Sequence, residues 1–483
     1  MIKRVVLATL LGVLLILGVN TLRQGSKQLQ VPAIPPIAFD ANLAAQHLAG
    51  ALRFRTIASA EVADQNSDQF LQLHAYLQST YPRAHAAMTR EVVGQYSLLY
   101  RWQGSDANAR PIMLMAHQDV VPIAAGTETS WQVAPFDGTI RNGYVWGRGA
   151  WDNKGNLLAM LEAIERLAAA GFQPRQTIYL AAGADEEVGG KRGAQAIAAL
   201  LQARGVRLDY VLDEGLLITD GMMKGLQQPA ALIGIAEKGY ATLLLEMDGA
   251  PGHSSMPPAV SLIGSMSGAL ARLEAHPLPA QLGGAARAML TTLAPEMTWP
   301  NRLLLSNLWL TAPLVSWQLQ KTPSTAAMLR TTTALTMVHA GNQDNVLPGT
   351  IAATVNFRLL PGDTEAAILA HVHAVIANDA IRVRVGPNNA PASRLADTAS
   401  VSYRAINRSV REVFPNTLVA PGLMIGATDA RYMESISDNV YRFSPVRALP
   451  ADLARFHGTD ERISIQNFGE MIQFYHRLLH GTA

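Results

Sequence analysis

The sequence predicts an α/β protein in which one layered domain is interrupted by a small α+β domain and preceded by a transmembrane helix. Three observations support this prediction. The N-terminus carries an uncharged apolar run. Short β-rich runs alternate with amphipathic helices, and this pattern changes near residue 238 and resumes near residue 389. A chain of 483 residues is also too long for one ordinary core, so two globular units are expected.

The N-terminus carries a membrane signal. Lys3 and Arg4 precede an uncharged run from Val5 to Leu22, which approaches the span of about 20 residues that crosses a bilayer. Basic residues before the run keep the N-terminus cytoplasmic, so the rest of the chain is expected on the periplasmic or other extracytoplasmic side. No small-x-small cleavage site follows, which favours a retained single-pass anchor over 1–23 rather than a removed signal peptide.

The layered domain is predicted in two pieces, over 40–237 and 389–483, after an extended Pro-rich linker at 24–39. Apolar residues at helical spacing alternate there with β-rich runs, which is typical of a sheet covered by helices. The expected helices span 42–81, 156–170 and 193–205, and the expected strands span 96–102, 111–115, 177–182 and 210–213.

A small α+β domain is predicted over 238–388, between the two pieces. Its recognisable strands and helices match the order of a βαββαβ unit and span 239–248, 260–275, 351–360, 364–378 and 381–385. An apolar stretch at 281–340, which includes Trp299, Trp309 and Trp317, is longer than such a unit needs.

The charge and the cysteine content exclude several kinds of site. The formal net charge is +2 and the 39 Lys and Arg residues are spread along the chain, so no basic block predicts a nucleic-acid groove. With 0 cysteines, the chain can hold no disulfide, iron–sulfur cluster, thiolate zinc site or cysteine nucleophile. Any metal must therefore bind to nitrogen and oxygen ligands, and small substrates are expected.

Acids and imidazoles follow the predicted strands. His117 and Asp119 come directly after an apolar strand, and a carboxylate beside a histidine orients and activates a zinc-binding imidazole. Asp152 lies among closely spaced glycines before a helix, which indicates a tight backbone path around a fixed acid. A structural histidine and a helix-capping aspartate are the alternatives for these two motifs.

Adjacent carboxylates favour a bound cation. Three consecutive acids, among them Glu186 and Glu187, end another apolar strand, where like charges resist joint ionisation unless a divalent metal neutralises them. A solvated acidic turn is the alternative. Asp213 ends a further strand, and His457 supplies a second imidazole near the C-terminus. The set that two zinc ions sharing one bridging carboxylate would require is His117, Asp152, Glu187, Asp213 and His457.

The motifs occur in a characteristic order: HQDVVP, GRGAWDNKG, ADEEVGG, LDEG, GHSSMPP, NVLPG, NFRLLPGD, GATDAR and HGTDERI. This series resembles the dinuclear zinc exopeptidase and amidohydrolase family, which includes aminoacylase-1, glutamate carboxypeptidase and carboxypeptidase S. The resemblance runs from Leu43 to His480. With its N-terminal anchor, the chain is most similar to the carboxypeptidase S and N-fatty-acyl-amino-acid hydrolase branch.

The resemblance implies a zinc-exopeptidase-like fold whose two Zn²⁺ ions are held by these side chains, with Co²⁺ or Mn²⁺ as alternatives. His117 and Glu187 would bind different metals, Asp152 would bridge them, and Asp213 and His457 would complete the two sites. The inserted domain would serve as a lid and as the surface of a homodimer.

The resemblance also implies roles beyond the metals. Asp119 would support the imidazole of His117, and Glu186 would be the general base. His253 would help to hold the oxyanion, in some members from the neighbouring subunit. Asn345 and Arg358 would bind substrate, Arg358 through a carboxylate. Turn caps for His253 and Asn345, and an ion pair for Arg358, are the alternatives.

Some positions differ from the family's common residues without removing a ligand or the base: Asn153, Ala427, Ala430 and Asp460. The peptide bond between Asp152 and Asn153 is expected to be cis, as in the family. The turn with Thr428, Asp429 and Arg431 is expected to shape the pocket.

These observations predict a membrane-anchored zinc metallopeptidase or amidohydrolase whose substrate carries a free carboxylate. It would release a C-terminal amino acid from a peptide or hydrolyse an N-acyl amino acid, and the reverse condensation is open to the same site. We hypothesise that 281–340 forms an apolar wall or portal for an acyl chain. The alternatives are a dipeptidase or deacetylase of polar substrates and, in another class, a noncatalytic binding or scaffolding protein.

Overall fold

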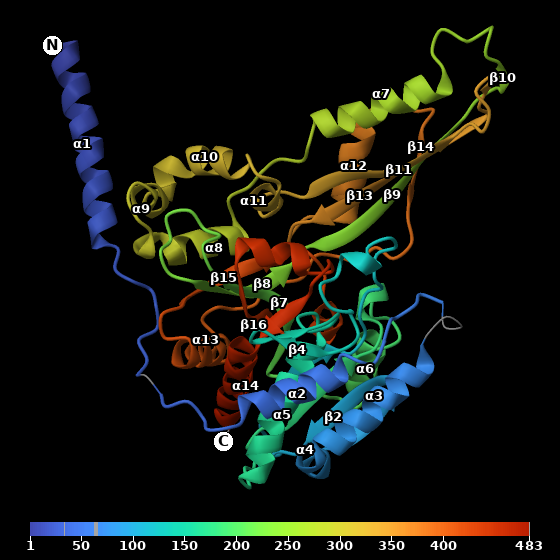
Figure 1. Cartoon of the computed structure of the whole chain (residues 1–483). Helices are drawn as coiled ribbons and strands as arrows, with labels where there is room; N and C mark the ends of the chain where they lie inside the picture. The colour runs from blue at the N-terminus through green and yellow to red at the C-terminus, as the bar shows by residue number, and fades with distance from the viewer. Residues whose placement is uncertain (33, 62–65, 483) are drawn as a thin grey trace.

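The computed structural model describes residues 1–32, 34–61 and 66–482. It shows an α/β body, a smaller lid domain and one projecting apolar helix, α1 (Ile2–Arg23) (Figure 1). This arrangement confirms the predicted fold class, an α/β domain interrupted by an α+β domain. Residue 33 of the expected linker and residues 62–65 of the expected first helical region lie outside the described residues.

An eight-stranded mixed sheet forms the centre of the body, in the order β1-β2-β6-β3-β7-β16-β8-β15. Its strands are β1 (Thr89–Val93), β2 (Ser97–Trp102), β3 (Ile112–His117), β6 (Ile178–Gly183), β7 (Tyr210–Thr219), β8 (Ala230–Glu237), β15 (Leu418–Met424) and β16 (Val440–Ala448). A second, three-stranded sheet contains β4 (Thr139–Arg141), β5 (Tyr144–Trp146) and β17 (Arg462–Ser464).

Helices cover both faces of the large sheet, which explains why its central strands are apolar throughout. In β3, Ile112 and Leu114 pack into one core while Met113 and Met115 pack into the other, as the two-residue period of a strand requires. The helices of the body are α2 (Ala41–Ala51), α3 (Ser67–Thr80), α4 (Pro82–Ala87), α5 (Lys154–Ala169), α6 (Ala194–Ala203), α13 (Val401–Val413) and α14 (Ile465–His480).

The predicted elements of the body correspond closely to the observed ones, with two differences. The expected helical region at 42–81 is two helices, α2 and α3, separated by a loop. The strand expected at 210–213 continues to residue 219 as β7, because its second half pairs with β16 and β8.

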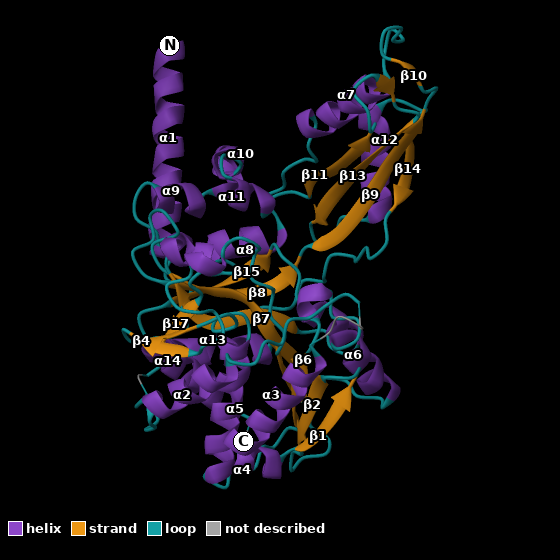
Figure 2. Cartoon of the chain, turned by 45° about the vertical axis from the view of Figure 1, so that its right-hand side comes forward, coloured by secondary structure: helices purple, strands orange, loops and turns teal. Residues whose placement is uncertain are grey.

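The lid domain is a four-stranded sheet in the order β11-β13-β9-β14, with two helices on one face (Figure 2). Along the chain its main elements follow the predicted βαββαβ order. They are β9 (Gly239–Asp248), α7 (Leu262–Ala275), β11 (Thr332–Ala340), β13 (Thr350–Leu359), α12 (Glu365–Ile376) and β14 (Arg382–Val385). A short hairpin sheet at the tip pairs β10 (Gly252–His253) with β12 (Val346–Leu347).

The apolar stretch at 281–340 is divided between the two domains. Its last nine residues form β11, an edge strand of the lid sheet. The rest forms α8 (Gly284–Leu293), α9 (Asn301–Ser306), α10 (Leu308–Leu319) and α11 (Pro323–Ala327). Met289 and Leu290 of α8 share a core with Leu418 and Ala420 of β15, so this part packs on the body rather than on the lid.

The linker after α1 contains no helix or strand among its described residues, in keeping with an extended segment. It is nevertheless attached to the body. The side-chain amide of Gln28 accepts from the backbone N–H of Val419 at 2.7 Å and donates to its carbonyl at 3.1 Å. The linker thus covers the outer edge of β15, beside which no further strand lies in the described part of the chain.

Candidate metal centre and active site

The candidate metal centre lies at one end of three neighbouring parallel strands, β6, β3 and β7. His117 is the last residue of β3, Glu187 lies in the 3₁₀ turn η3 (Glu186–Val188) after β6, and Glu214 lies within β7. Parallel strands bring their carboxyl ends to the same edge of a sheet. The sheet order therefore brings together residues that are almost 100 positions apart in the sequence.

Asp152 lies between two histidines from distant parts of the chain. Its Oδ1 is 2.9 Å from His117 Nε2 and its Oδ2 is 2.8 Å from His457 Nε2. The peptide bond between Asp152 and Asn153 is cis, as the family resemblance implied. A carboxylate that faces two imidazoles through separate oxygens has the arrangement that a bridging metal ligand needs.

One further glutamate lies beside each histidine. Glu214 Oε1 is 3.3 Å from His117 Nε2, and Glu187 Oε2 is 3.4 Å from His457 Nε2. Potential ligand atoms within 4.8 Å of one another form two groups, which consist of His117, Glu186 and Glu214, and of His117, Asp152 and Glu187. Imidazole and carboxylate are the nitrogen and oxygen ligands that Zn²⁺ accepts in the absence of thiolates.

The structure places Asp213 differently from the sequence prediction. Its Oδ1 accepts from the backbone N–H of Glu214 at 2.9 Å and its Oδ2 from that of Ala430 at 2.7 Å. Among the described residues, neither candidate metal group contains Asp213, whereas Glu214 beside it faces His117. Adjacent side chains of a strand point to opposite faces, so LDEG can present one acid to the site and the motif alone does not show which.

Asp119 connects the two loops that carry the first ligands. Its backbone carbonyl lies 2.9 Å from His117 Nδ1, and its carboxylate Oδ1 lies 3.5 Å from the same nitrogen. The carboxylate also accepts from the backbone N–H groups of Glu186 at 3.3 Å and Glu187 at 3.1 Å. Asp119 therefore lies where the sequence predicted it, behind the imidazole of His117, and it additionally fixes the acidic turn.

The concentration of buried charge shifts the titration of the whole cluster. Burial, followed by the charge of Asp152, raises the pKa of Glu214 to about 8, and burial raises the pKa of Asp213 to about 6. Hydrogen bonds to Asp152 and Glu187 raise the pKa of His457 to about 10. At Asp152, burial raises the pKa of the carboxyl, but His117 and His457 lower it by more, so the net pKa is lowered. Imidazolium groups thus balance the carboxylates of the metal-free site.

The candidate general base has a proton affinity suited to its role. Burial, with additional repulsion from Glu214, Asp429 and Glu187, raises the pKa of the Glu186 carboxyl well above its usual value, although the charge of His117 opposes this shift. A carboxylate with a raised pKa accepts a proton more readily at neutral pH.

The donor set fits a pair of divalent cations. Oε1 of Glu187 is buried without a hydrogen-bond partner, although the other oxygen of this carboxylate lies beside His457. A buried, unpaired carboxylate oxygen is costly unless a cation is close to it. Nitrogen and oxygen donors, a carboxylate shared between two histidines and the unpaired oxygen together match the requirements of such a site.

Two residues that the sequence analysis did not select hold the ligand loops together. Glu461 Oε1 accepts from the backbone N–H groups of Gly149, Trp151 and Asp152 at 2.9–3.0 Å. Its Oε2 lies 2.6 Å from Arg148 Nη1, and Arg148 Nη2 donates to the carbonyl of His457 at 3.1 Å. Both residues belong to motifs that were recognised for their ligands, GRGAWDNKG and HGTDERI. The features of the sequence that could have identified Arg148 and Glu461 were their charge and their position inside these motifs.

The turn predicted to shape the pocket lies beside the acidic loop. Arg431 Nη2 donates to the carbonyl of Gly189 at 2.8 Å, just beyond η3. Thr428 donates to Glu237, the last residue of β8, at 2.8 Å. Asp429 is buried, and burial raises the pKa of its carboxyl well above the usual value. Of the positions that depart from the family, Asn153 donates to Glu214, whereas Asp460 accepts from Gln132 outside the metal groups.

The three lid residues of the sequence prediction lie in two places. His253 and Asn345 are exposed at the tip, where β10 pairs with β12, and Figure 1 shows this hairpin at the end of the lid farthest from the large sheet. The structure therefore does not bring them to the metal groups of the same chain. Arg358 lies at the opposite end of β13, where its guanidinium stacks over Tyr240 at 4.8 Å and is partly buried.

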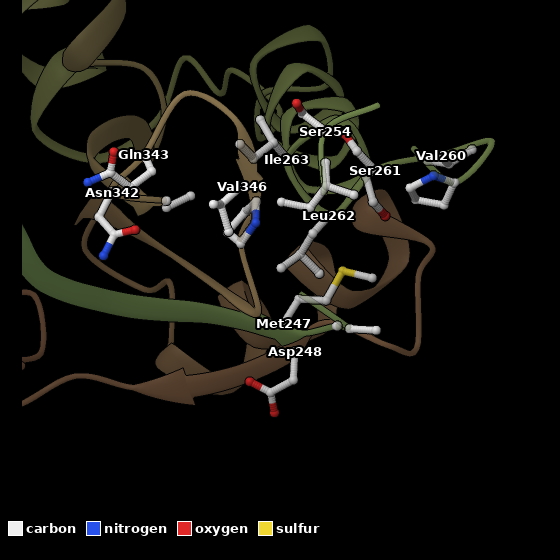
Figure 3. Close-up of a pocket in the computed structure, with 18 of the residues that line it drawn as sticks. Met247, Asp248, Ser254, Val260, Ser261, Leu262, Ile263, Asn342, Gln343 and Val346 are labelled. Carbon is white, nitrogen blue, oxygen red and sulfur yellow. The ribbon is translucent and has the colours of Figure 1, made fainter. Parts of the chain in front are cut away.

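The lid tip also contains a cavity of about 920 Å³. Met247, Leu262 and Val346 point into it from β9, α7 and β12 (Figure 3). Its lining comes from the lid alone, from 247–265, 340–348 and residue 378. We place the active site at the metal groups rather than in this cavity, because the metal groups combine buried acids, imidazoles and a candidate base, which the lining of the cavity does not.

A comparison with known families identifies the chain. The model of peptidase family M20/M25/M40 matches residues 113–481. The chain belongs to this family. M20 membership confirms the recognised resemblance and the predicted enzyme class, a metallohydrolase of peptides or N-acyl amino acids, and it argues against the noncatalytic alternative.

Relatives among characterised sequences extend over nearly the whole chain. A Dictyostelium discoideum protein named "Probable carboxypeptidase S-like 2" is 38% identical, covering 100% of this chain and 94% of that protein. A Xenopus tropicalis protein named "N-fatty-acyl-amino acid synthase/hydrolase PM20D1" is 40% identical, covering 90% and 85%. The M20 family metallo-carboxypeptidase Sso-CP2 from Sulfolobus solfataricus has a TM-score of 0.65 at 18% identity and covers 90% of this chain and 98% of that one, which shows a shared fold.

Proposed function

We propose that this M20 hydrolase uses two Zn²⁺ ions to cleave the amide bond of N-acyl amino acids with long acyl chains. One observation carries the proposal. The two carboxylate oxygens of Asp152 face His117 and His457, at 2.9 and 2.8 Å, and a glutamate lies beside each histidine. The names of the relatives, carboxypeptidase S-like and N-fatty-acyl-amino acid synthase/hydrolase, support this substrate class.

The two cations would be held by His117, Asp152, Glu187, Glu214 and His457, with Glu214 in place of Asp213. When bound, the cations polarise the scissile carbonyl and lower the pKa of water. Glu186 takes the proton of the attacking water on its carboxylate and delivers it to the leaving nitrogen. The backbone carbonyl of Asp119 lies beside Nδ1 of His117, and Nε2 therefore faces Asp152.

The free carboxylate of the substrate would bind to the lid. Arg358 presents a guanidinium at the end of the lid sheet that adjoins the body, and nearby Arg431 lies beside the acidic turn. A planar guanidinium binds a carboxylate through two parallel hydrogen bonds. Burial lowers the pKa of Arg358 from its usual high value, yet an arginine stays charged at neutral pH.

His253 and Asn345 would act on the substrate of a second subunit. They lie on the exposed hairpin of the lid tip, away from the metal groups of their own chain. A homodimer formed through the lid would allow each tip to reach the partner's site, where His253 would stabilise the oxyanion. This arrangement accounts for the position of the motif, which lies away from the metal groups of its own chain.

The enzyme would be anchored to a membrane with its body on the extracytoplasmic side. α1 is 22 residues long, and only 11% of its most apolar segment is buried, so its surface is available to lipid. Length and composition also fit a signal sequence. The basic residues Lys3 and Arg4 before the apolar run favour a cytoplasmic N-terminus.

Substrate profiling of the purified enzyme tests the proposal. N-oleoyl, N-acetyl and dipeptide substrates with the same C-terminal residue are compared by kcat/KM, and the N-oleoyl compound is expected to be the best. Glu186→Gln should lower kcat by about 10²–10⁴-fold while both metals remain bound, because it removes the proton acceptor only. Equal turnover of N-oleoyl and N-acetyl substrates would overturn the acyl-chain preference. Activity that persists in Glu186→Gln and after chelation would overturn the mechanism.

A further inference from the structure

Helix α10 presents an unpartnered apolar face. Trp309, Leu310, Leu314 and Trp317 are 61%, 47%, 50% and 57% exposed. Their spacing places them on one side of the helix, together with exposed Pro313, whereas Leu308 and Val315 face the body and are buried. Large apolar side chains gathered in this way on a folded protein mark an interaction surface.

The position of this face relative to α1 indicates what covers it. The last turns of α1 dock on α9 and on the junction between α9 and α10, and both figures show α9 at the lower end of α1 with α10 next to α9 (Figures 1 and 2). Asn307, which is fully buried, donates to Thr21 Oγ1 at 3.0 Å and to the carbonyl of Leu17 at 3.2 Å. Asn20 donates to Asn307 Oδ1 at 2.9 Å and to the carbonyl of Ser306 at 3.0 Å.

These contacts hold the membrane helix against the body, so the linker is not its sole connection to the described part of the body. Gln24, just after α1, donates to the carbonyl of Ser306 at 2.9 Å, and Arg302 donates to the carbonyl of Gln24 at 3.1 Å. A bilayer that surrounds α1 down to this junction must therefore meet the segment that follows Asn307, which is α10.

The chemistry of the face matches the boundary between lipid headgroups and acyl chains. Trp309 and Trp317 combine an apolar body with a polar N–H, the combination that is enriched at membrane interfaces. The ammonium of Lys321, just beyond the end of α10, lies 3.5 Å from the centre of the Trp317 ring. A cation beside this exposed ring is available to a lipid phosphate.

We propose that α10 is an interfacial membrane helix whose apolar face inserts into the same bilayer leaflet that surrounds the end of α1. The body is then held against the lipid at two places. The helical segment continues through α11 toward the start of the lid, where the ammonium of Lys238 donates to the carbonyls of Ala327 at 2.9 Å and Arg330 at 2.8 Å. This inference rests on the proposed membrane placement of α1.

The absence of cysteine in the sequence allows a direct test with the full-length protein. A single cysteine is introduced at Leu314 on α10, at Leu11 on α1 or at Arg408 on α13, and each is labelled with a nitroxide. The proteins are reconstituted into vesicles of phosphatidylethanolamine and phosphatidylglycerol. Collision of the label with oxygen, which concentrates in lipid, is compared with collision with a water-soluble nickel chelate. Leu310→Cys serves as the second α10 variant if Leu314→Cys loses activity.

The labels at 11 and 314 are expected to be accessible to oxygen and protected from nickel, while the label at 408 behaves in the opposite way. If the labels at 314 and 408 behave alike while the label at 11 is in lipid, the proposed role of α10 is overturned and the membrane placement of α1 is not. Labels at 11 and 314 that are both in water would overturn the membrane placement of α1 as well. Protection of position 314 from both reagents, with broadening between labels, would indicate a protein partner instead and would also overturn the proposal.

Discussion

The metal centre and the lid tip contain similar residue types in opposite environments. At the metal centre, His117 and Asp152 are buried, and their contacts are fixed by other side chains and by backbone groups. At the lid tip, the side chain of His253 is exposed, and among the described residues its hydrogen-bond partner is Ser255, at 2.8 Å. The difference indicates that one chain contains all the candidate metal ligands, whereas the role proposed for the tip would require a second subunit.

The largest expected effect tests whether the tip acts on a partner. His253→Ala should lower kcat by about 10²–10³-fold, the cost of losing one oxyanion donor, without changing metal content or thermal stability. A mixture of His253→Ala and Glu186→Gln subunits should recover about a quarter of wild-type activity, because about half of the dimers are mixed and each has one complete site. Recovery of no activity after confirmed subunit exchange would contradict action in trans.

The second prediction separates the two neighbouring acids of β7. Glu214→Gln should weaken binding of one of the two metals by at least the roughly 10–100-fold that loss of an outer-shell partner costs. Asp213→Asn should retain both metals, because its carboxylate contacts the backbone of Glu214 and Ala430. Metal content after dialysis against buffered zinc measures both variants. Loss of a metal in Asp213→Asn alone would restore the assignment made from the sequence.

The third prediction concerns the connection between the ligand loops. Glu461→Gln should lower metal affinity about 10–100-fold, because it weakens three backbone hydrogen bonds around Asp152 and the ion pair with Arg148. The matched control is Glu470→Gln, which breaks an ion pair of 2.7 Å with Arg447 at the surface. Competition with a zinc-binding dye measures both. Equal affinities of the two variants would show that Glu461 does not position the ligands.

The smallest effect concerns pH. The folded, metal-free site holds protons on Glu214 up to about pH 8, on Asp213 up to about pH 6 and on His457 up to about pH 10, above the usual values of these groups. Their contribution to stability is therefore present at low pH and is lost as pH rises through these values. Cations need the deprotonated groups, so the increase in Tm on adding zinc should grow between about pH 5.5 and about pH 8.

Differential scanning fluorimetry at buffered free zinc measures this increase. The comparison of metal-loaded and metal-free protein at each pH removes the contributions of groups far from the site. An increase in Tm that is constant over this range, or that falls, would contradict the raised pKa values of the cluster.

Local patterns determined most of the secondary structure. The alternation of apolar residues predicted β9 at 239–248 without error, because a strand with one buried face has a strict two-residue period. The same patterns could not predict where 281–340 packs. The partner of an apolar helix depends on which surfaces the rest of the fold offers, and here these are the sheet edge at β15 and the end of α1. Asp213 and Glu214 were likewise ambiguous, because the face that each presents depends on the position of β7 in the sheet.

The sequence by itself determined the kind of chemistry. With no cysteine and with acids and histidines at strand ends, only nitrogen and oxygen ligands for hard or borderline cations were available. The tertiary structure decided which of these side chains meet. It brought His457 to Asp152, placed Glu214 rather than Asp213 beside His117 and placed His253 away from the candidate metal groups. The physical reason is that ligand identity is a property of single residues, whereas their convergence depends on strand order and on the packing of loops far apart in the chain.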